Sequence, residues 1–179
     1  TDCDTVPSVV IPEGVTAISR QAFWECENLV SVTIAQTVTS IGWAAFDYCP
    51  KLTSVVIPES VQDFYGCIFN GCTGLTYVEV RSRASCKEIV PSRYSGTLYI
   101  PNMEPADLKD WVKDMAVAGF CRLHLQGHPM EEATVSNYQA YLVKIRGHIC
   151  QNRTKDKDLI RYMLQTGLLR LQDIDKVLG

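Results

Sequence analysis

Apolar residues recur at fixed offsets through the first hundred positions of the chain. Written in blocks of 23 residues that each begin at a cysteine, the sequence aligns at Cys3, Cys26, Cys49 and Cys72. The fourth, seventh and ninth positions of the blocks hold Val6, Leu29, Leu52 and Leu75, then Val9, Val32, Val55 and Val78, then Ile11, Ile34, Ile57 and Val80. Because the last two columns alternate with other residues, they predict a short strand with one buried face. A fixed period of this length predicts a solenoid, in which each turn is stabilised by its neighbours.

A second apolar pair follows in three of the blocks and predicts a second short strand. The pairs are Val15 and Ile18, Val38 and Ile41, and Val61 and Phe64. Each of these blocks then closes on an apolar residue followed by phenylalanine, at Ala22-Phe23, Ala45-Phe46 and Ile68-Phe69. We expect each ring to fill the inside of its turn near the next cysteine.

These motifs resemble the BspA-type leucine-rich repeat. The residues that carry the resemblance are Ile11-Pro12-Glu13, Ile57-Pro58-Glu59, Ile41-Gly42, Ala22-Phe23 and Ala45-Phe46. The resemblance implies a right-handed leucine-rich-repeat β-solenoid over residues 1–101. It also implies a bacterial protein that acts in surface adhesion or protein binding, at an extracellular or cell-surface location. Composition alone leaves a cytoplasmic location open.

The fourth block departs from the repeat. Its pattern is lost after Val80, which predicts a distorted terminal turn. Smaller departures occur at Ala35, where the second turn has no proline, and at Cys67 and Ile68, which crowd the small-residue position of the third turn. The segment Leu98-Tyr99-Ile100-Pro101 restores a strand signal and predicts a final strand that closes the stack.

Residues 102–179 carry helical rather than strand-like spacing, so we expect a small all-α domain after the solenoid and an α/β solenoid fold for the whole chain. The first predicted helix opens near Pro105 and ends by Gly127 and Pro129. A second covers residues 131–150, a third is capped by Thr154 and ends at Gly167, and a short fourth covers residues 173–178. The segment DLIRYMLQTGLLRLQDIDKVL is similar to the helix pair of an ankyrin-like repeat. We expect these helices to cover the last turn of the solenoid.

Charge and hydropathy exclude two classes of partner. The chain has a net charge of -3, and residues 1–101 carry 6 basic and 10 acidic side chains against 11 and 10 in the remainder. Neither half has the basic excess of a nucleic-acid-binding protein, and no apolar run approaches the roughly 18 residues of a membrane span. The sequence begins without methionine, which favours a processed chain or an expressed fragment.

The chain contains eight cysteines, and the four that open the blocks form one column. Stacked turns about 4.8 Å apart would aim these side chains in parallel into the core, so we expect reduced, buried thiols. Cys67 and Cys86 lie off this column, and their pairing at the surface stays open.

One constellation has the residue types of a metal site. Cys121, His124 and His128 are spaced along one helix face, and His148 and Cys150 follow. However, Gly127 interrupts the helix before His128, and the last two residues point to different sides. We therefore favour core thiols and surface imidazoles, and we predict no metal and no cofactor. Nucleophile-elbow, phosphate-loop and dinucleotide glycine motifs are absent from the sequence, so we predict no catalytic residues and no enzyme.

The outward positions of the main strands are the most suitable for binding a partner. The candidate binding residues are Ser31, Thr33, Ser54, Val56, Tyr77, Glu79 and Arg81. Sheet propensity alone also accounts for hydroxyl and branched residues at exposed strand positions. Trp24, Trp43 and Tyr65 are further candidates as aromatic platforms, or they pack between turns.

The sequence therefore predicts a non-catalytic protein-interaction or adhesion module with a protein or glycan partner. One alternative is a structural segment of a longer repeat array without a site of its own. A metal-binding helical domain is the less favoured alternative.

Overall fold

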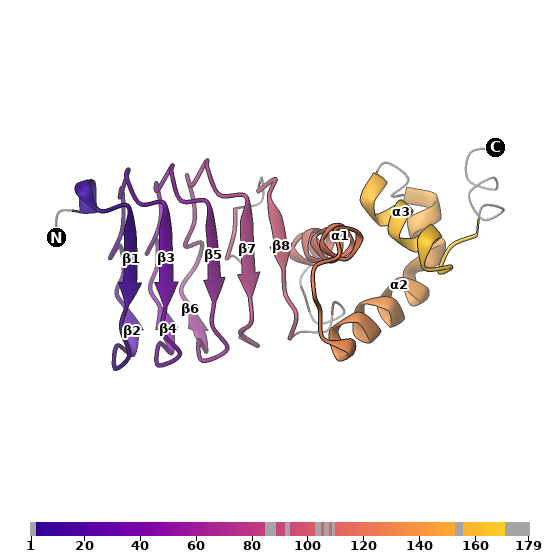
Figure 1. Cartoon of the computed structure of the whole chain (residues 1–179), viewed down its shortest axis with the longest axis horizontal. Coiled ribbons are helices and arrows are strands. Elements are labelled where there is room, and N and C mark those ends of the chain that lie inside the picture. The colour runs from indigo at the N-terminus through magenta and orange to yellow at the C-terminus, as the bar shows by residue number, and fades with distance from the viewer. Residues whose placement is uncertain are drawn as a thin grey trace.

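The computed structural model describes residues 3–84, 89–91, 94–102, 105, 108, 110–152 and 156–170. A short 3-10 helix, η1 (Cys3–Thr5), is followed by a stack of parallel turns and then by helices, in line along the long axis (Figure 1). The main strands are β1 (Ser8–Ile11), β3 (Ser31–Ile34), β5 (Ser54–Ile57), β7 (Tyr77–Val80) and β8 (Thr97–Tyr99). They form one parallel sheet in the order β1-β3-β5-β7-β8. The predicted solenoid is confirmed.

The register shows that one sequence period is one turn. Ser8 pairs with Ser31, Ser31 with Ser54, and Ser54 with Tyr77. The second predicted strand is also present, as β2 (Ala17–Ile18), β4 (Ser40–Ile41) and β6 (Asp63–Phe64), which form a parallel sheet of their own. The last turn is shorter, because Tyr77 pairs with Thr97. The predicted closing strand is therefore confirmed in β8.

The inward columns form the core of the solenoid. In β3 and β5 exposed and buried residues alternate, so that Val32, Ile34, Val55 and Ile57 face inward. The phenylalanine rings stack from turn to turn, with centroid distances of 5.2 Å from Phe23 to Phe46 and 5.7 Å from Phe46 to Phe69. The predicted ring column inside the turns is confirmed.

The first turn is less covered than the others. Val6 stands in the same column as the fully buried Leu29 and Leu52, yet it is 38% exposed. Among the described residues η1 precedes this turn, and it leaves Val6 partly exposed.

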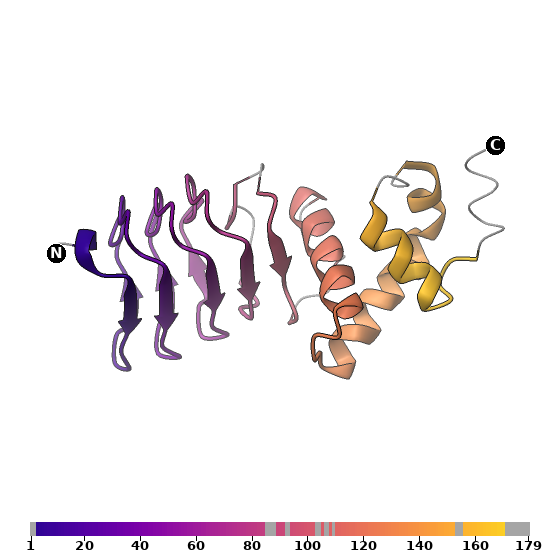
Figure 2. The same ribbon diagram turned by 45° about the horizontal axis from the view of Figure 1, so that its top comes forward.

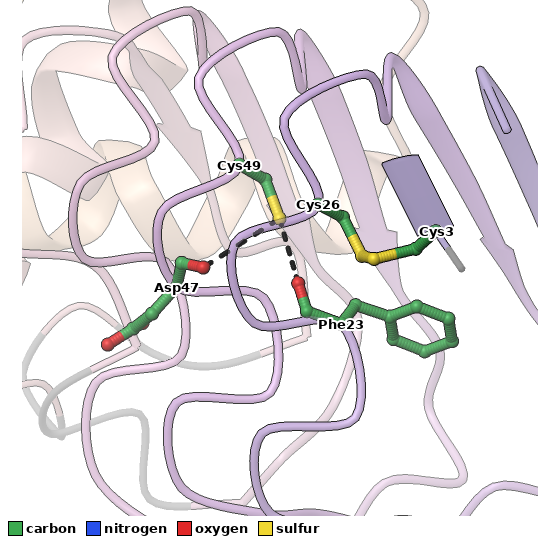
Figure 3. The surroundings of a disulfide bond; sticks show 5 residues. All are labelled: Cys3, Phe23, Cys26, Asp47 and Cys49. Atoms are coloured by element: carbon green, nitrogen blue, oxygen red, sulfur yellow. Dashed lines mark hydrogen bonds between the residues drawn. A yellow bond between two sulfur atoms is a disulfide. The ribbon is translucent and has the colours of Figure 1, made fainter. Parts of the chain in front are cut away.

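The prediction of a fully reduced cysteine column is wrong. Cys3 and Cys26 are joined by a disulfide, with their Cα atoms 5.3 Å apart, a separation within the usual range for disulfides. Their side chains turn toward one another instead of running in parallel (Figure 3). Cys49 and Cys72 are free thiols. Cys86 lies outside the described residues, so its pairing with Cys67 stays untested.

Three described helices follow the solenoid: α1 (Asp110–Leu125), α2 (Glu132–Asn152) and α3 (Lys157–Gln165). They match the first three predicted helices, although the cap of α3 differs. Asp156, rather than Thr154, is the N-cap, and its carboxylate accepts a hydrogen bond from the Leu159 backbone N–H at 3.1 Å. Thr154 and the predicted helix over 173–178 lie outside the described residues. None of the helices that the structure describes is long and apolar enough to cross a membrane.

Helix α1 belongs to two hydrophobic cores. Val112 and Ala116 pack into the core of the solenoid, whereas Phe120 and Cys121 pack among the helices. The helix runs beside β8 and covers the last strand of the sheet (Figure 2). Exposed strand edges are otherwise prone to pair with other chains, so α1 acts as a cap for the sheet.

Three hydrogen bonds fix the cap to the end of the solenoid. Tyr138 in α2 donates from its hydroxyl to the Ile100 carbonyl at 3.1 Å, and Thr134 donates to the Pro101 carbonyl at 3.0 Å. Arg122 in α1 donates to the Thr97 hydroxyl at 3.1 Å. The cap is therefore attached by both apolar packing and polar contacts.

Gly119 sets the closest approach of α1 to β8. A methyl group at this position would overlap the backbone carbonyl of Leu98. We expect Gly119→Ala to lower the free energy of unfolding by about 3 kcal/mol, because the strand backbone has no room to move aside. Urea unfolding followed by circular dichroism measures this change.

Gly147→Ala is the matched control. Gly147 lies in α2 with open space where its Cβ would be. The same substitution there should raise stability by about 0.5 to 1 kcal/mol through helix propensity. Equal effects of the two substitutions would contradict the close packing of α1 on β8.

Candidate interaction surface

The outward side of the main sheet places four of the predicted binding residues together. Ser31 and Thr33 are exposed on β3, and Ser54 and Val56 are exposed on the neighbouring strand β5. Ser31 and Ser54 are direct partners in the parallel register. The structure therefore brings these residues onto one continuous surface.

The other three predicted residues form a connected polar group at the next strand. The Tyr77 hydroxyl donates to Glu79 Oε2 at 2.8 Å, and Arg81 Nε donates to Glu79 Oε1 at 2.7 Å. Glu79 is only 8% exposed, whereas half of the Arg81 side chain is accessible. Glu79 thus holds Tyr77 and Arg81 in position, and Arg81 is the member of the group that is open to a partner.

Burial and the hydrogen bond to Glu79 both raise the pKa of Tyr77 above its ordinary value. Loss of the phenolic proton would place a second negative charge beside the Glu79 carboxylate and would remove the hydrogen bond. Tyr77 therefore acts as a neutral donor over the physiological range.

A cleft of about 540 Å3 opens beside this polar group, where the ends of β5, β7 and β8 meet the loop between α1 and α2. Its lining consists of Glu59, Glu79, Arg81, Tyr99, Pro101, Asn102, His128, Pro129, Met130 and Glu131. As binding residues, the sequence analysis singled out only Glu79 and Arg81 of this set, and it named His128 as a possible metal ligand. Residues 128–131 reach the strand ends only because the helices dock there, and their local motifs carry no signal for that docking.

Acidic side chains predominate in the cleft. Glu59, Glu79 and Glu131 contribute carboxylates, whereas Arg81 is the only arginine or lysine in the lining. The pKa of Tyr99 is raised, first by burial and then by the nearby carboxylates of Glu79 and Glu131. Since Arg81 is already paired with Glu79, the net negative charge of the lining comes from Glu59 and Glu131.

The described residues of the candidate metal site do not come together. His124 packs edge-on against Tyr162 in the helical core, at a centroid distance of 5.1 Å, while His128 lies against Tyr99 at the cleft, at 6.0 Å. Cys121 is buried among the helices, and His148 is exposed. Over the part of the chain that the structure describes, no group of three or more His, Cys, Asp or Glu residues is arranged to hold a metal ion.

The candidate aromatic residues are exposed and also contact their neighbours. Trp24, Trp43 and Tyr65 all have large exposed fractions. Trp24 meets Tyr48 edge-on at 6.3 Å, and the Arg20 guanidinium lies 4.6 Å from the centre of the Trp43 ring. Each tryptophan therefore contacts a neighbouring side chain and keeps a large exposed fraction, and a role of the three residues as platforms for a partner stays a prediction.

A parallel solenoid of 23-residue turns with inward leucine, valine and isoleucine columns is the architecture of leucine-rich-repeat proteins. The chain belongs to the BspA-type leucine-rich repeat family: the model of the BspA type leucine rich repeat region matches residues 1–104, with six copies. Proteins of this family are typically interaction or surface modules and are not enzymes.

Three solved structures are similar to the chain. A leucine rich cell surface protein from Faecalibacterium prausnitzii is 33% identical over 45% of this chain, with a TM-score of 0.44. A leucine-rich repeat protein from Bacteroides ovatus is 23% identical over 61%, with a TM-score of 0.44, and the Treponema pallidum (T. pallidum) leucine rich repeat protein is 24% identical over 57%, with a TM-score of 0.39. The chain spans 21%, 30% and 56% of these three proteins, respectively. Among curated proteins, none matches the chain.

Tyr77→Phe tests the polar group. The substitution removes the donor to Glu79, and at neutral pH we expect the free energy of unfolding to fall by roughly 2 kcal/mol. In the wild type, the raised pKa of Tyr77 contributes stability that is present below the ordinary value of 10.0 and is lost as pH rises above it. The stability difference between the two proteins, measured by urea unfolding, should therefore shrink above pH 10.

Tyr65→Phe serves as the control, because the Tyr65 side chain is exposed and lies outside the polar group. Its effect on stability at neutral pH should be close to zero. A Tyr77→Phe protein as stable as the wild type at neutral pH would show that the bond to Glu79 contributes nothing.

Proposed function

We propose that the chain is a protein-binding module whose interaction face consists of the outward sheet residues Ser31, Thr33, Ser54, Val56, Tyr77, Glu79 and Arg81. The observation that carries this proposal is the continuity of the face with the acidic cleft. Glu79 and Arg81 belong to both, since they stand on or directly after β7 and also line the cleft. A partner that lies across the strands can therefore extend from the face directly into the cleft.

The size of the face limits its affinity. Five strands about 4.8 Å apart span roughly 20 Å, and strands of four residues add roughly 13 Å, which gives about 250 Å2. A stable complex buries roughly 800 Å2 on each partner. Binding through the sheet alone is therefore weak, and the partner gains area by also contacting the cleft and the helical cap.

The charge of the cleft favours a basic group on the partner. Glu59 and Glu131 line the cleft, and the paired Arg81 leaves them uncompensated within it. A lysine or arginine side chain of a bound polypeptide would meet two carboxylates there, and such complementarity governs specificity and association rate more than affinity.

An extracellular or cell-surface location fits this proposal. The Cys3–Cys26 disulfide is of the kind that persists in oxidising compartments, and family membership points the same way. Adhesion is the finer form of the proposal, in which the partner belongs to another cell or its surroundings.

A second candidate function is that of a structural segment within a longer array. The first turn favours it, because Val9, Val15 and Phe23 are only partly buried, whereas their counterparts Val32, Val38 and Phe46 are buried. A further turn stacked on β1 would cover these side chains.

Peptides of equal length and differing charge provide the test. We expect the full chain to bind cationic peptides better than neutral or anionic ones, as measured by fluorescence anisotropy. Glu59→Gln and Glu131→Gln should each weaken binding of the cationic peptide about threefold, the size expected of a single partly exposed charge pair. Thr33→Arg, which places a long side chain on the face, should reduce it further.

Glu13→Gln and Gln62→Arg are the matched controls, because both positions are exposed and lie outside the face and the cleft. Neither should change binding. Equal binding of all three peptide classes, or a Thr33→Arg protein that binds as the wild type does, would overturn the proposed face.

A further inference from the structure

The free cysteines Cys49 and Cys72 occupy equivalent places in consecutive turns. The Cys49 thiol donates to the Phe23 carbonyl at 3.1 Å, and the Cys72 thiol donates to the Phe46 carbonyl at 3.0 Å. Each of these contacts spans 26 residues, so a shift by one turn superposes one environment on the other. Two side chains in such equivalent positions are separated only by the spacing of the turns.

The Cys3–Cys26 disulfide shows what this spacing permits. It joins residues 23 positions apart whose Cα atoms lie 5.3 Å from one another, within the usual range for disulfides. Cys49 and Cys72 have the same separation in sequence, and neighbouring parallel turns stand about 4.8 Å apart. The backbone therefore allows a second cross-link in the column.

The two thiols also influence one another's ionisation. A Cys49 thiolate would accept a hydrogen bond from the Cys72 thiol in place of the Phe46 carbonyl, so this bond lowers the pKa of Cys49, and the same bond, together with burial, raises the pKa of Cys72. The pair shares its protons, so that removal of one proton leaves a thiolate on Cys49 and a thiol on Cys72 beside it.

Only one of the two sulfurs is open to a reagent. Cys49 is completely buried, whereas Cys72 is partly exposed and lines an opening of about 380 Å3. A small molecule therefore reaches Cys72 first, and Cys49 reacts only through Cys72.

We propose that Cys49 and Cys72 are a modification site at which a small-molecule disulfide introduces a second cross-link into the solenoid. Cys72 Sγ attacks one sulfur of the reagent as its proton passes to the Cys49 thiolate, breaks the sulfur–sulfur bond of the reagent and releases one molecule of thiol. Cys49 then loses that proton, attacks Cys72 Sγ and releases the second molecule of thiol. The two cysteines are oxidised, the reagent is reduced to two thiols, and the two cysteine protons end on those products.

Glutathione disulfide and the full chain provide the test. After incubation, the remaining thiols are alkylated in denaturant, and the digested protein is analysed by mass spectrometry. We expect a linked peptide pair that contains Cys49 and Cys72 and lacks the mass of two hydrogen atoms. Its formation should raise the thermal midpoint by roughly 5 °C relative to Cys72→Ala treated in the same way.

Cys67→Ser is the matched variant that assigns the link. No lysine, arginine or glutamate separates Cys67 from Cys72, so ordinary digestion leaves both in one peptide. The link should persist in Cys67→Ser and be absent from Cys49→Ala and Cys72→Ala, whose folding is checked by circular dichroism. Three outcomes would overturn the proposal. They are a link between Cys26 and Cys49, a reaction that stops at the mixed disulfide on Cys72, and the absence of the link from Cys67→Ser.

Discussion

The structure depends on the parallel pairing of identical turns at one fixed register. Ser8, Ser31, Ser54 and Tyr77 stand one above the other, and this register aligns every other column, from the phenylalanine stack to the cysteines. A single turn of 23 residues has no core of its own and buries its apolar face only against its neighbours. For the same reason, each end of the stack needs its own cover for the apolar face that no neighbouring turn buries.

The two ends of the solenoid are covered in different ways. At β8 the helix α1 covers the edge, fills the solenoid core with Val112 and Ala116, and brings the loop before α2 to the strand ends. The acidic cleft is a product of that docking, since His128 and Glu131 lie in the chain far from Glu59 and Glu79. At β1 the cover consists of η1 and the Cys3–Cys26 disulfide, and the first turn stays partly open.

The repeat region was largely predictable because its physics is periodic. Columns such as Leu29 and Leu52, or Phe23 and Phe46, identify the strands, the core and the length of a turn together. The helical spacing of apolar residues in the second half of the chain locates α1, α2 and α3. Prediction failed where the period carries no information. The column of cysteines does not say whether neighbouring side chains turn toward one another, as Cys3 and Cys26 do, and the cleft depends on contacts between segments for which the sequence has no common pattern.

The disulfide also has a mechanical consequence. The first described element, η1, and the last, α3, lie toward opposite ends of the elongated molecule (Figure 1), so a pull between them acts along the stacking axis and draws the turns out as extended chain. The cross-link holds Cys3 and Cys26 together, so the chain between them, which spans a sequence separation of 23, cannot be extended. At about 3.5 Å per residue, the stretched chain with the disulfide is roughly 80 Å shorter than the same chain without it. The first turn therefore stays closed while later turns open.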